Sequence, residues 1–357
     1  MSGPRGELGG AHGVLADLPP AGFAMVMATG IVSVASHLEG FPRLAQALFA
    51  LNILAWTVLW ALNLLRASRY PGRFLADLGS HARAPGFFTA VAATGVLGAQ
   101  FASLAGNYRV ASALFVLAVA LWVALTYSVF TALTIRMDKP TLERGLSGIW
   151  LLAIVATQSV AVLAAQLAAH ADPQWKLQLN FFALSMWLWG GMLYIWIMTL
   201  IFYRYTFLRL SPGDLTPPYW INMGAMAIST LAGSLLVLNA PNAPLLDSLL
   251  PFLKGFTVLY WATGTWWIPM LVVLGVWRYV WKRFPLEYDS SYWGAVFPLG
   301  MYSVCTHEMQ RALGLAFLDV VARVFLVAAL AAWALAFAGL LHWILASAAR
   351  PRGGSRV

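Results

Sequence analysis

The chain of 357 residues contains ten apolar segments of about the length needed to cross a lipid bilayer. A membrane-spanning helix needs about 20 mostly apolar residues, and only short polar breaks separate these segments. They lie at approximately 19–37, 44–65, 85–105, 110–135, 146–169, 177–202, 219–238, 250–281, 292–306 and 318–345. We therefore predict an all-α integral membrane protein with ten transmembrane helices.

The composition supports a single membrane domain. Hydrophobic residues make up 61% of the chain and charged residues 10%, whereas soluble proteins contain about 25% charged residues. We expect one domain at 19–347, between an N-terminal tail at 1–18 and a basic C-terminal tail at 348–357. The N-terminal tail lacks the apolar core of a signal peptide, so the first helix is expected to direct insertion.

The net charge of +9 does not indicate a nucleic-acid partner, because the basic residues are spread over short connections between the apolar segments. If the chain crosses the membrane ten times, 16 of the 22 basic residues fall on the side of the N-terminus. The other six are Arg43, Arg109, Lys176, Lys254, Arg311 and Arg323. The positive-inside rule therefore predicts that both termini are cytoplasmic.

Odd-numbered and even-numbered segments differ in composition. The first and third contain Thr29-Gly30 and Thr94-Gly95 after a phenylalanine, whereas the even-numbered segments are bulky and apolar all round. This alternation predicts five helical hairpins in a quasi-fivefold arrangement, with the odd helices around a central pore. The predicted pore-lining residues are Thr29, Gly30, Thr94, Gly95, Thr157, Ser159, Thr230, Gly300 and Ser303. The alternative is that these small residues allow close helix packing and that the hydroxyls bond carbonyls of their own helices.

Two runs resemble a known family. GFAMVMATGIVS, from Gly22 to Ser33, and WGAVFPLGMYS, from Trp293 to Ser303, are similar to motifs of the tellurite-resistance/dicarboxylate transporter family. Its members include bacterial tellurite-resistance proteins, fungal malate permeases and sulfite pumps, and plant slow anion channels. The resemblance implies a homotrimer of ten-helix subunits in the plasma (bacterial inner) membrane, each with its own pore for a small anionic solute.

The resemblance also implies a gate. In the bacterial and plant members a phenylalanine before a proline in the ninth helix closes the pore, and the matching pair here is Phe297-Pro298. An aromatic ring across a narrow apolar constriction excludes water and ions. The alternative is an ordinary core aromatic beside a proline kink.

Ionisable residues are scarce in the odd segments, so the exceptions are of interest. His307 and Glu308 lie at the end of the ninth segment, and we consider both candidates for proton coupling. The alternative is that they mark the point where the helix leaves the membrane. His307-Glu308 lacks the second histidine of a zinc-protease motif, and the single cysteine excludes a multi-cysteine site, so we predict neither a metal nor a cofactor.

The sequence thus favours transport of small anions over catalysis. C4-dicarboxylates such as malate and succinate, sulfite, and inorganic anions are the candidate solutes, moved either by a proton-coupled carrier or by a passive channel. A membrane-embedded enzyme of the acyltransferase kind, with His307 as the base, is the alternative. The sequence shows no acid or nucleophile that would lie at the same depth in the membrane as His307 and act with it.

Overall fold

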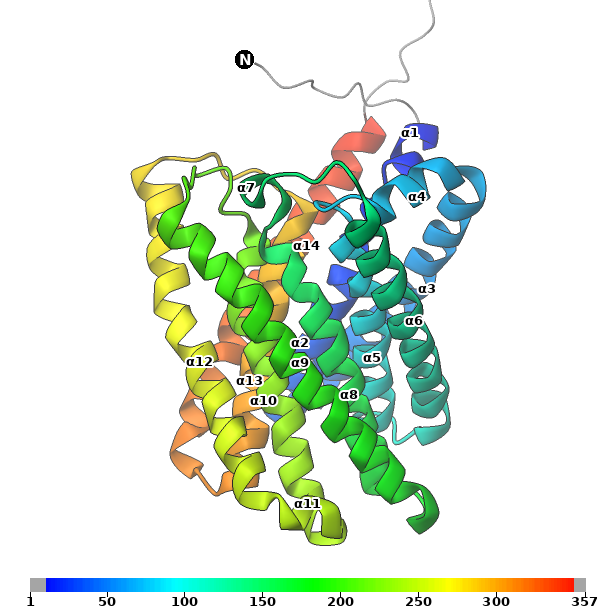
Figure 1. Ribbon diagram of the computed structural model, residues 1–357, viewed down its shortest axis with the longest axis vertical. Coiled ribbons are helices and arrows are strands. Elements are labelled where there is room, and N and C mark those ends of the chain that lie inside the picture. Colours follow the sequence, from blue (N-terminus) through cyan, green and yellow to red (C-terminus); the bar gives the residue numbers. More distant parts are fainter. Residues whose placement is uncertain (1–10, 350–357) are drawn as a thin grey trace, which may run out of the picture.

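The computed structural model describes residues 11–349, all of whose regular structure is helical (Figure 1). Ten helices are at least 15 residues long. They are α2 (Ala24–Leu38), α3 (Pro42–Arg69), α5 (Phe88–Ser103), α6 (Tyr108–Ile135), α8 (Leu152–His170), α9 (Pro173–Phe207), α10 (Ile221–Asn239), α12 (Leu250–Val276), α13 (Trp293–Leu313) and α14 (Asp319–Ala349). The short helices are α1 (Ala11–Ala16), α4 (Pro71–Leu78), α7 (Leu142–Gly145) and α11 (Pro244–Ser248).

Five of the long helices pack against one another in a closed order. Helix α2 contacts α5, α5 contacts α8, α8 contacts α10, α10 contacts α13, and α13 returns to α2. We call these five the inner helices. The other five, α3, α6, α9, α12 and α14, each follow an inner helix in the chain and pack against it. Each of these outer helices also touches the next inner helix around the ring.

Burial separates the two sets of helices. Among residues 11–349, nine helices are long and apolar enough to cross a membrane. The most apolar windows of α5, α8 and α10 are each 89% buried, whereas those of α3, α6 and α14 are each 17% buried. The exception among the ten is α13, because polar residues such as Ser303, His307 and Glu308 lower its hydropathy. Helix α13 is nevertheless largely buried among α2, α10 and α14.

A short helical turn precedes each inner helix and aims it into the bundle. Four of these turns are 3-10 helices of four residues: Pro20–Phe23, Ala84–Phe87, Gly148–Leu151 and Pro217–Trp220. The fifth is Ser290–Tyr292, before α13. Three of the five turns have proline in their first positions, where the missing N–H costs no helical hydrogen bond.

The two ends of the bundle differ. Helices α1, α4 and α7 lie at the end where α14 finishes, and α11 lies at the opposite end (Figure 1). We call the first end the terminal face and the second the far face. The described chain therefore begins and ends on the same face. Of the predicted tails, residues 1–10 and 350–357 lie outside the described residues, together with Arg5, Arg350, Arg352 and Arg356.

Candidate functional site: two cavities inside the ring of inner helices

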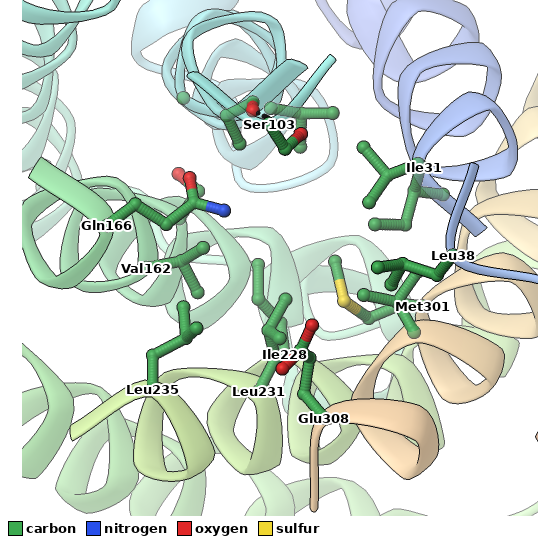
Figure 2. Close-up of a pocket in the computed structure, with 16 residues that line it drawn as sticks. Ile31, Leu38, Ser103, Val162, Gln166, Ile228, Leu231, Leu235, Met301 and Glu308 are labelled. Carbon is green, nitrogen blue, oxygen red and sulfur yellow. Dashed lines mark hydrogen bonds between the residues drawn. The ribbon is translucent and has the colours of Figure 1, made fainter. Parts of the chain in front are cut away.

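A cavity of about 50 Å³ opens between the inner helices towards the far face (Figure 2). All five inner helices line it, each with residues spaced by three and then four positions, which is the spacing of one helix face. The five stripes are 31-34-38 on α2, 96-99-103 on α5, 159-162-166 on α8, 228-231-235 on α10 and 301-304-308 on α13. We call this space the far cavity. Its walls are one regular pattern repeated five times.

The far cavity changes character along its length. Its deepest layer contains Ile31, Ile228 and Met301 together with the small residues Gly95 and Ser159. The layer nearest the far face contains Ser103, Gln166 and Glu308, and Figure 2 shows the Gln166 amide and the Glu308 carboxylate directed into the open space. The cavity is therefore polar at its mouth and mostly apolar at its base.

A second cavity of about 270 Å³ lies at the terminal face, among the starts of α2, α8, α10 and α13. Arg83, Asp289 and Ser291 line its outer part, and Met27, Leu152, Ile221 and Phe297 are among the apolar residues that line it. We call this space the terminal cavity.

On α2 and α13 about one helical turn separates the residues that line the two cavities, whereas on α8 and α10 about two turns do. Phe297 lines the terminal cavity and Met301 the far cavity, as Met27 and Ile31 do on α2. Four residues along a helix advance about 6 Å. The Phe297 side chain is 1% exposed, so it is buried in the layer between the two spaces. We call this layer the partition.

Comparison with known proteins identifies the family to which this arrangement belongs. Residues 17–341 match the voltage-dependent anion channel family, SLAC1. The chain belongs to the SLAC1 family. This confirms the family predicted from the two sequence motifs, because the tellurite-resistance and dicarboxylate transporters are grouped with it. The family is one of anion channels, which indicates transport rather than catalysis for this chain.

Two relatives span most of the chain, and a third matches less than half of it. An uncharacterized transporter of Methanocaldococcus jannaschii is 27% identical and covers 83% of this chain and 86% of its own. A sulfite efflux pump of Trichophyton rubrum is 24% identical and covers 91% of this chain and 90% of its own. An uncharacterized membrane protein of Mycobacterium tuberculosis is 39% identical over 158 residues, which is 44% of this chain and 80% of its own.

The structure places the predicted pore-lining residues on two different faces. Gly95 and Ser159 line the far cavity. Thr29, Thr94, Thr157, Thr230 and Ser303 are buried and line neither of the two cavities. Each of these five differs by two positions from the first residue of its helix's stripe, namely Ile31, Val96, Ser159, Ile228 or Met301. Two residues rotate a helix by about 200°. The hydroxyls thus lie on the side of the inner helices that faces away from the far cavity.

The hydroxyl groups take part in hydrogen bonds within the bundle. Thr94, Thr157 and Thr230 donate to carbonyls four residues earlier at 2.7 to 2.8 Å, which is the alternative that the sequence left open. Ser303 donates to the Ala322 carbonyl of α14 at 2.7 Å. These contacts stabilise helix packing and leave the walls of the cavities to other residues.

A repeated tryptophan contact joins each outer helix to the next inner helix. In each case an indole Nε1–H donates a hydrogen bond. The pairs are Trp56 to Thr94 at 3.2 Å, Trp122 to Thr157 at 2.8 Å, Trp187 to the Ser229 carbonyl at 2.8 Å, Trp261 to Thr306 at 3.0 Å and Trp333 to Thr29 at 3.0 Å. We did not predict this role of the tryptophans from the sequence. The available signal was that each even-numbered segment contains at least one tryptophan.

The predicted glycines Gly30 and Gly300 serve contact between helices. A Cβ atom at Gly30 would lie 2.6 Å from Val96 of α5, and one at Gly300 would lie 3.0 Å from Ile31 of α2. Only glycine allows the backbones to approach this closely. Pro298, predicted beside the gate, lies inside α13 and packs against Gly224 of α10.

The predicted proton-linked pair lies at the far face in two separate clusters. His307 Nδ1 is 2.9 Å from Glu39 Oε1, which brings together the ends of α2 and α13. Glu39 also lies 3.5 Å from Arg323 of α14. Glu308 lines the far cavity and pairs with Arg311 at 2.8 Å. Within residues 11–349, no group of three or more His, Cys, Asp or Glu side chains is arranged to hold a metal ion.

Proposed function

We propose that the chain moves small anions across a membrane along the axis of the five inner helices, in a quasi-fivefold arrangement of five hairpins. The observation that carries this proposal is the pair of cavities that open to opposite faces and approach within one helical turn at Phe297. Membership of the SLAC1 family supports anions as the class of solute.

The lining favours weakly held anions over cations. The residues that line the cavities at the partition carry no charge, and the deepest layer of the far cavity offers only the Ser159 hydroxyl as a polar side chain. A cation would need carboxylate or carbonyl ligands to replace its water. At the terminal face Arg83 and Asp289 line the cavity, and Arg83 pairs with Asp77 at 2.7 Å, so charges of both signs lie at this mouth.

Phe297 is the proposed gate, with Pro298 directly after it. Its buried ring faces the terminal cavity with Met27 and Leu152. An apolar constriction of this kind closes a path by excluding water. Pro298 cannot donate a hydrogen bond within α13, which loosens the backbone beside the ring.

The proposed solutes are sulfite and C4-dicarboxylates such as malate and succinate, with inorganic anions as the alternative set. The relative named as a sulfite efflux pump supports sulfite. We further propose a homotrimer in the plasma membrane, with both termini cytoplasmic, as the resemblance and the distribution of basic residues predict.

The decisive experiment is flux through purified protein in liposomes. Chloride, nitrate, sulfite, malate and succinate are compared with and without a proton gradient. Uptake of malate or succinate that depends on the proton gradient would establish a carrier, and current without proton dependence would establish a channel. Absence of flux for all five solutes would overturn the proposal.

Proton coupling is tested with the same liposomes. We propose His307 and Glu308 as the coupled groups, because the first bonds Glu39 at the far face and the second lines the far cavity. His307→Gln and Glu308→Gln should each reduce gradient-driven uptake while leaving exchange at equal pH intact. An unchanged response to the gradient in both variants would assign the two residues to structure alone.

A further inference from the structure

Two outer helices end in the same short pattern, an aromatic residue followed by arginine and tyrosine. Helix α9 carries it at 203–205, around Arg204, and the continuation of α12 carries it at 277–279, around Arg278. Each arginine lies 17 positions after the tryptophan that bonds the next inner helix, which is Trp187 on α9 and Trp261 on α12. The two arginines are therefore equivalent positions in the repeat, and their surroundings can be compared directly.

Arg204 has a carboxylate and two hydrogen-bond acceptors as partners from the chain, although its Nε atom has no partner. Its guanidinium donates to the Leu146 carbonyl at 2.9 Å and to the Tyr219 hydroxyl, and it lies 3.4 Å from the Asp214 carboxylate. Partial burial alone would raise the pKa of Asp214, but hydrogen bonds from Ser211 and the nearby Arg204 charge outweigh burial and hold that pKa below its usual value. At this position the chain supplies its own anion.

Arg278 has no such anion. Arg278 is 7% exposed, and neither its Nε nor its Nη1 atom has a hydrogen-bond partner. In the described part of the chain, no carboxylate lies within ion-pair distance of it. Glu287, five positions before Tyr292 as Asp214 is five before Tyr219, is exposed and lines a separate cavity beside α14. A buried charge without a partner is costly.

Two aromatic rings contact the guanidinium of Arg278. Its central carbon lies 4.2 Å from the centre of the Phe284 ring and 5.0 Å from that of Tyr279. Aromatic contacts of this kind cover the faces of a guanidinium and leave its N–H edge available. The arginine also lies within a π-helical turn, Trp277–Trp281, a distortion that often marks functional sites.

The space beside Arg278 is a cavity of about 80 Å³ at the terminal face, between the starts of α10 and α13 and the end of α12. Thr216, Tyr279 and Tyr292 line it with their hydroxyl-bearing side chains, and the two tyrosine hydroxyls lie 3.0 Å apart. This space is large enough for several water molecules or one small oxyanion. It shares no lining residue with either cavity of the proposed path.

We propose that the Arg278 cavity binds a phosphate group, with the guanidinium as its charged ligand and the hydroxyls of Thr216 and Tyr279 as further donors. Arginine binds phosphate oxygens through two parallel N–H groups, and such pairs are strong in partly buried sites. The group comes either from a phospholipid headgroup at the membrane surface or from free phosphate. Lys282 and Arg283, both exposed and next in sequence, add positive charge at the same face.

The two sources are separated by thermal denaturation of the delipidated full chain in a neutral detergent. One arm adds inorganic phosphate against chloride at equal ionic strength, and the other adds phosphatidylglycerol against a neutral glycolipid. We expect one arm to raise the melting temperature of the wild-type chain, and that arm identifies the source. In Arg278→Gln the apparent affinity should fall at least tenfold. Arg69→Gln, which removes an exposed charge at the end of α3 on the same face, should respond as the wild type does.

A second variant keeps the test decisive if Arg278→Gln does not fold. Thr216→Glu places a carboxylate beside Arg278, as Asp214 lies beside Arg204. This variant should have a higher melting temperature without ligand and lose its response to phosphate or phosphatidylglycerol. The proposal is overturned if neither arm stabilises the wild-type chain, or if both variants respond as the wild type does. Anion flux is not measured, so failure here leaves the transport proposal standing.

Discussion

The inner and outer helices differ in their burial and in the side chains that they present to their surroundings. Inner helices are largely buried and bring glycine, alanine and hydroxyl residues against one another. Outer helices expose large apolar side chains such as Leu54, Val116 and Val327. Lipid is as apolar as leucine, so burying large side chains between helices gains little in a membrane. The inner helices are instead held by close backbone approach and by hydrogen bonds. The inner and outer helices are thus distinguished by their position in the bundle rather than by their hydropathy.

The largest expected effect comes from opening the inner ring at its partition. Phe297→Ala should raise anion flux, because the apolar ring that excludes water is removed. Each reduction of about 1.4 kcal/mol in the free-energy barrier to permeation increases the rate tenfold. Flux per folded protein is measured in liposomes. Phe88→Ala is the matched control, since Phe88 is equally buried on inner helix α5 but lines neither cavity. Equal fluxes in the two variants would remove Phe297 from the path.

The next effect concerns close packing. A Cβ at Gly224 would lie 2.7 Å from Pro298 of α13, whereas a Cβ at Gly255 of outer helix α12 meets nothing within 4 Å. Gly224→Ala should therefore destabilise the protein by about 1–3 kcal/mol. Gly255→Ala should be neutral or stabilising by up to about 1 kcal/mol. Melting temperatures in detergent compare the two, and equal values would show that the inner ring is not tightly packed at this contact.

A smaller effect is expected where the two rings are joined. Trp122→Phe keeps an aromatic ring but loses the bond to the Thr157 hydroxyl, which should cost about 1 kcal/mol. Thr157→Val in the same background should add less than it costs alone, because the two changes remove one shared bond. Trp266→Phe, at an exposed tryptophan of α12, is the control. Strict additivity of the Trp122 and Thr157 effects would contradict the link.

The smallest effect distinguishes the two faces of one inner helix. Ser159 lines the far cavity and Thr157 faces the outer ring. Ser159→Ala should change the flux by about twofold, equivalent to about 0.4 kcal/mol in the barrier, with little change in stability. Thr157→Val should change stability and leave the flux as it is. The reverse result would restore Thr157 to the lining of the path.

Much of the architecture follows from the sequence. Long apolar runs with short polar breaks determine the helices, because every backbone group in lipid must be bonded within its own segment. The contrast between small, hydroxyl-bearing segments and bulky ones also predicts which helices are buried. The two motifs around Thr29 and Phe297 were sufficient to identify the family.

Which face of each inner helix lines the cavities was decided by the tertiary structure. A helix that is buried all round has no polar face from which its orientation can be predicted. Thr157 and Ser159 are therefore indistinguishable in sequence, although their side chains point in opposite directions. The hydrogen-bond partners of the hydroxyls include tryptophans dozens to hundreds of residues away in the sequence, such as Trp333 for Thr29. The same holds for Arg204 and Arg278, which share a local pattern but differ because one loop brings a carboxylate to its arginine and the other turns its carboxylate away. Local sequence determines helices, and long-range packing decides what their side chains meet.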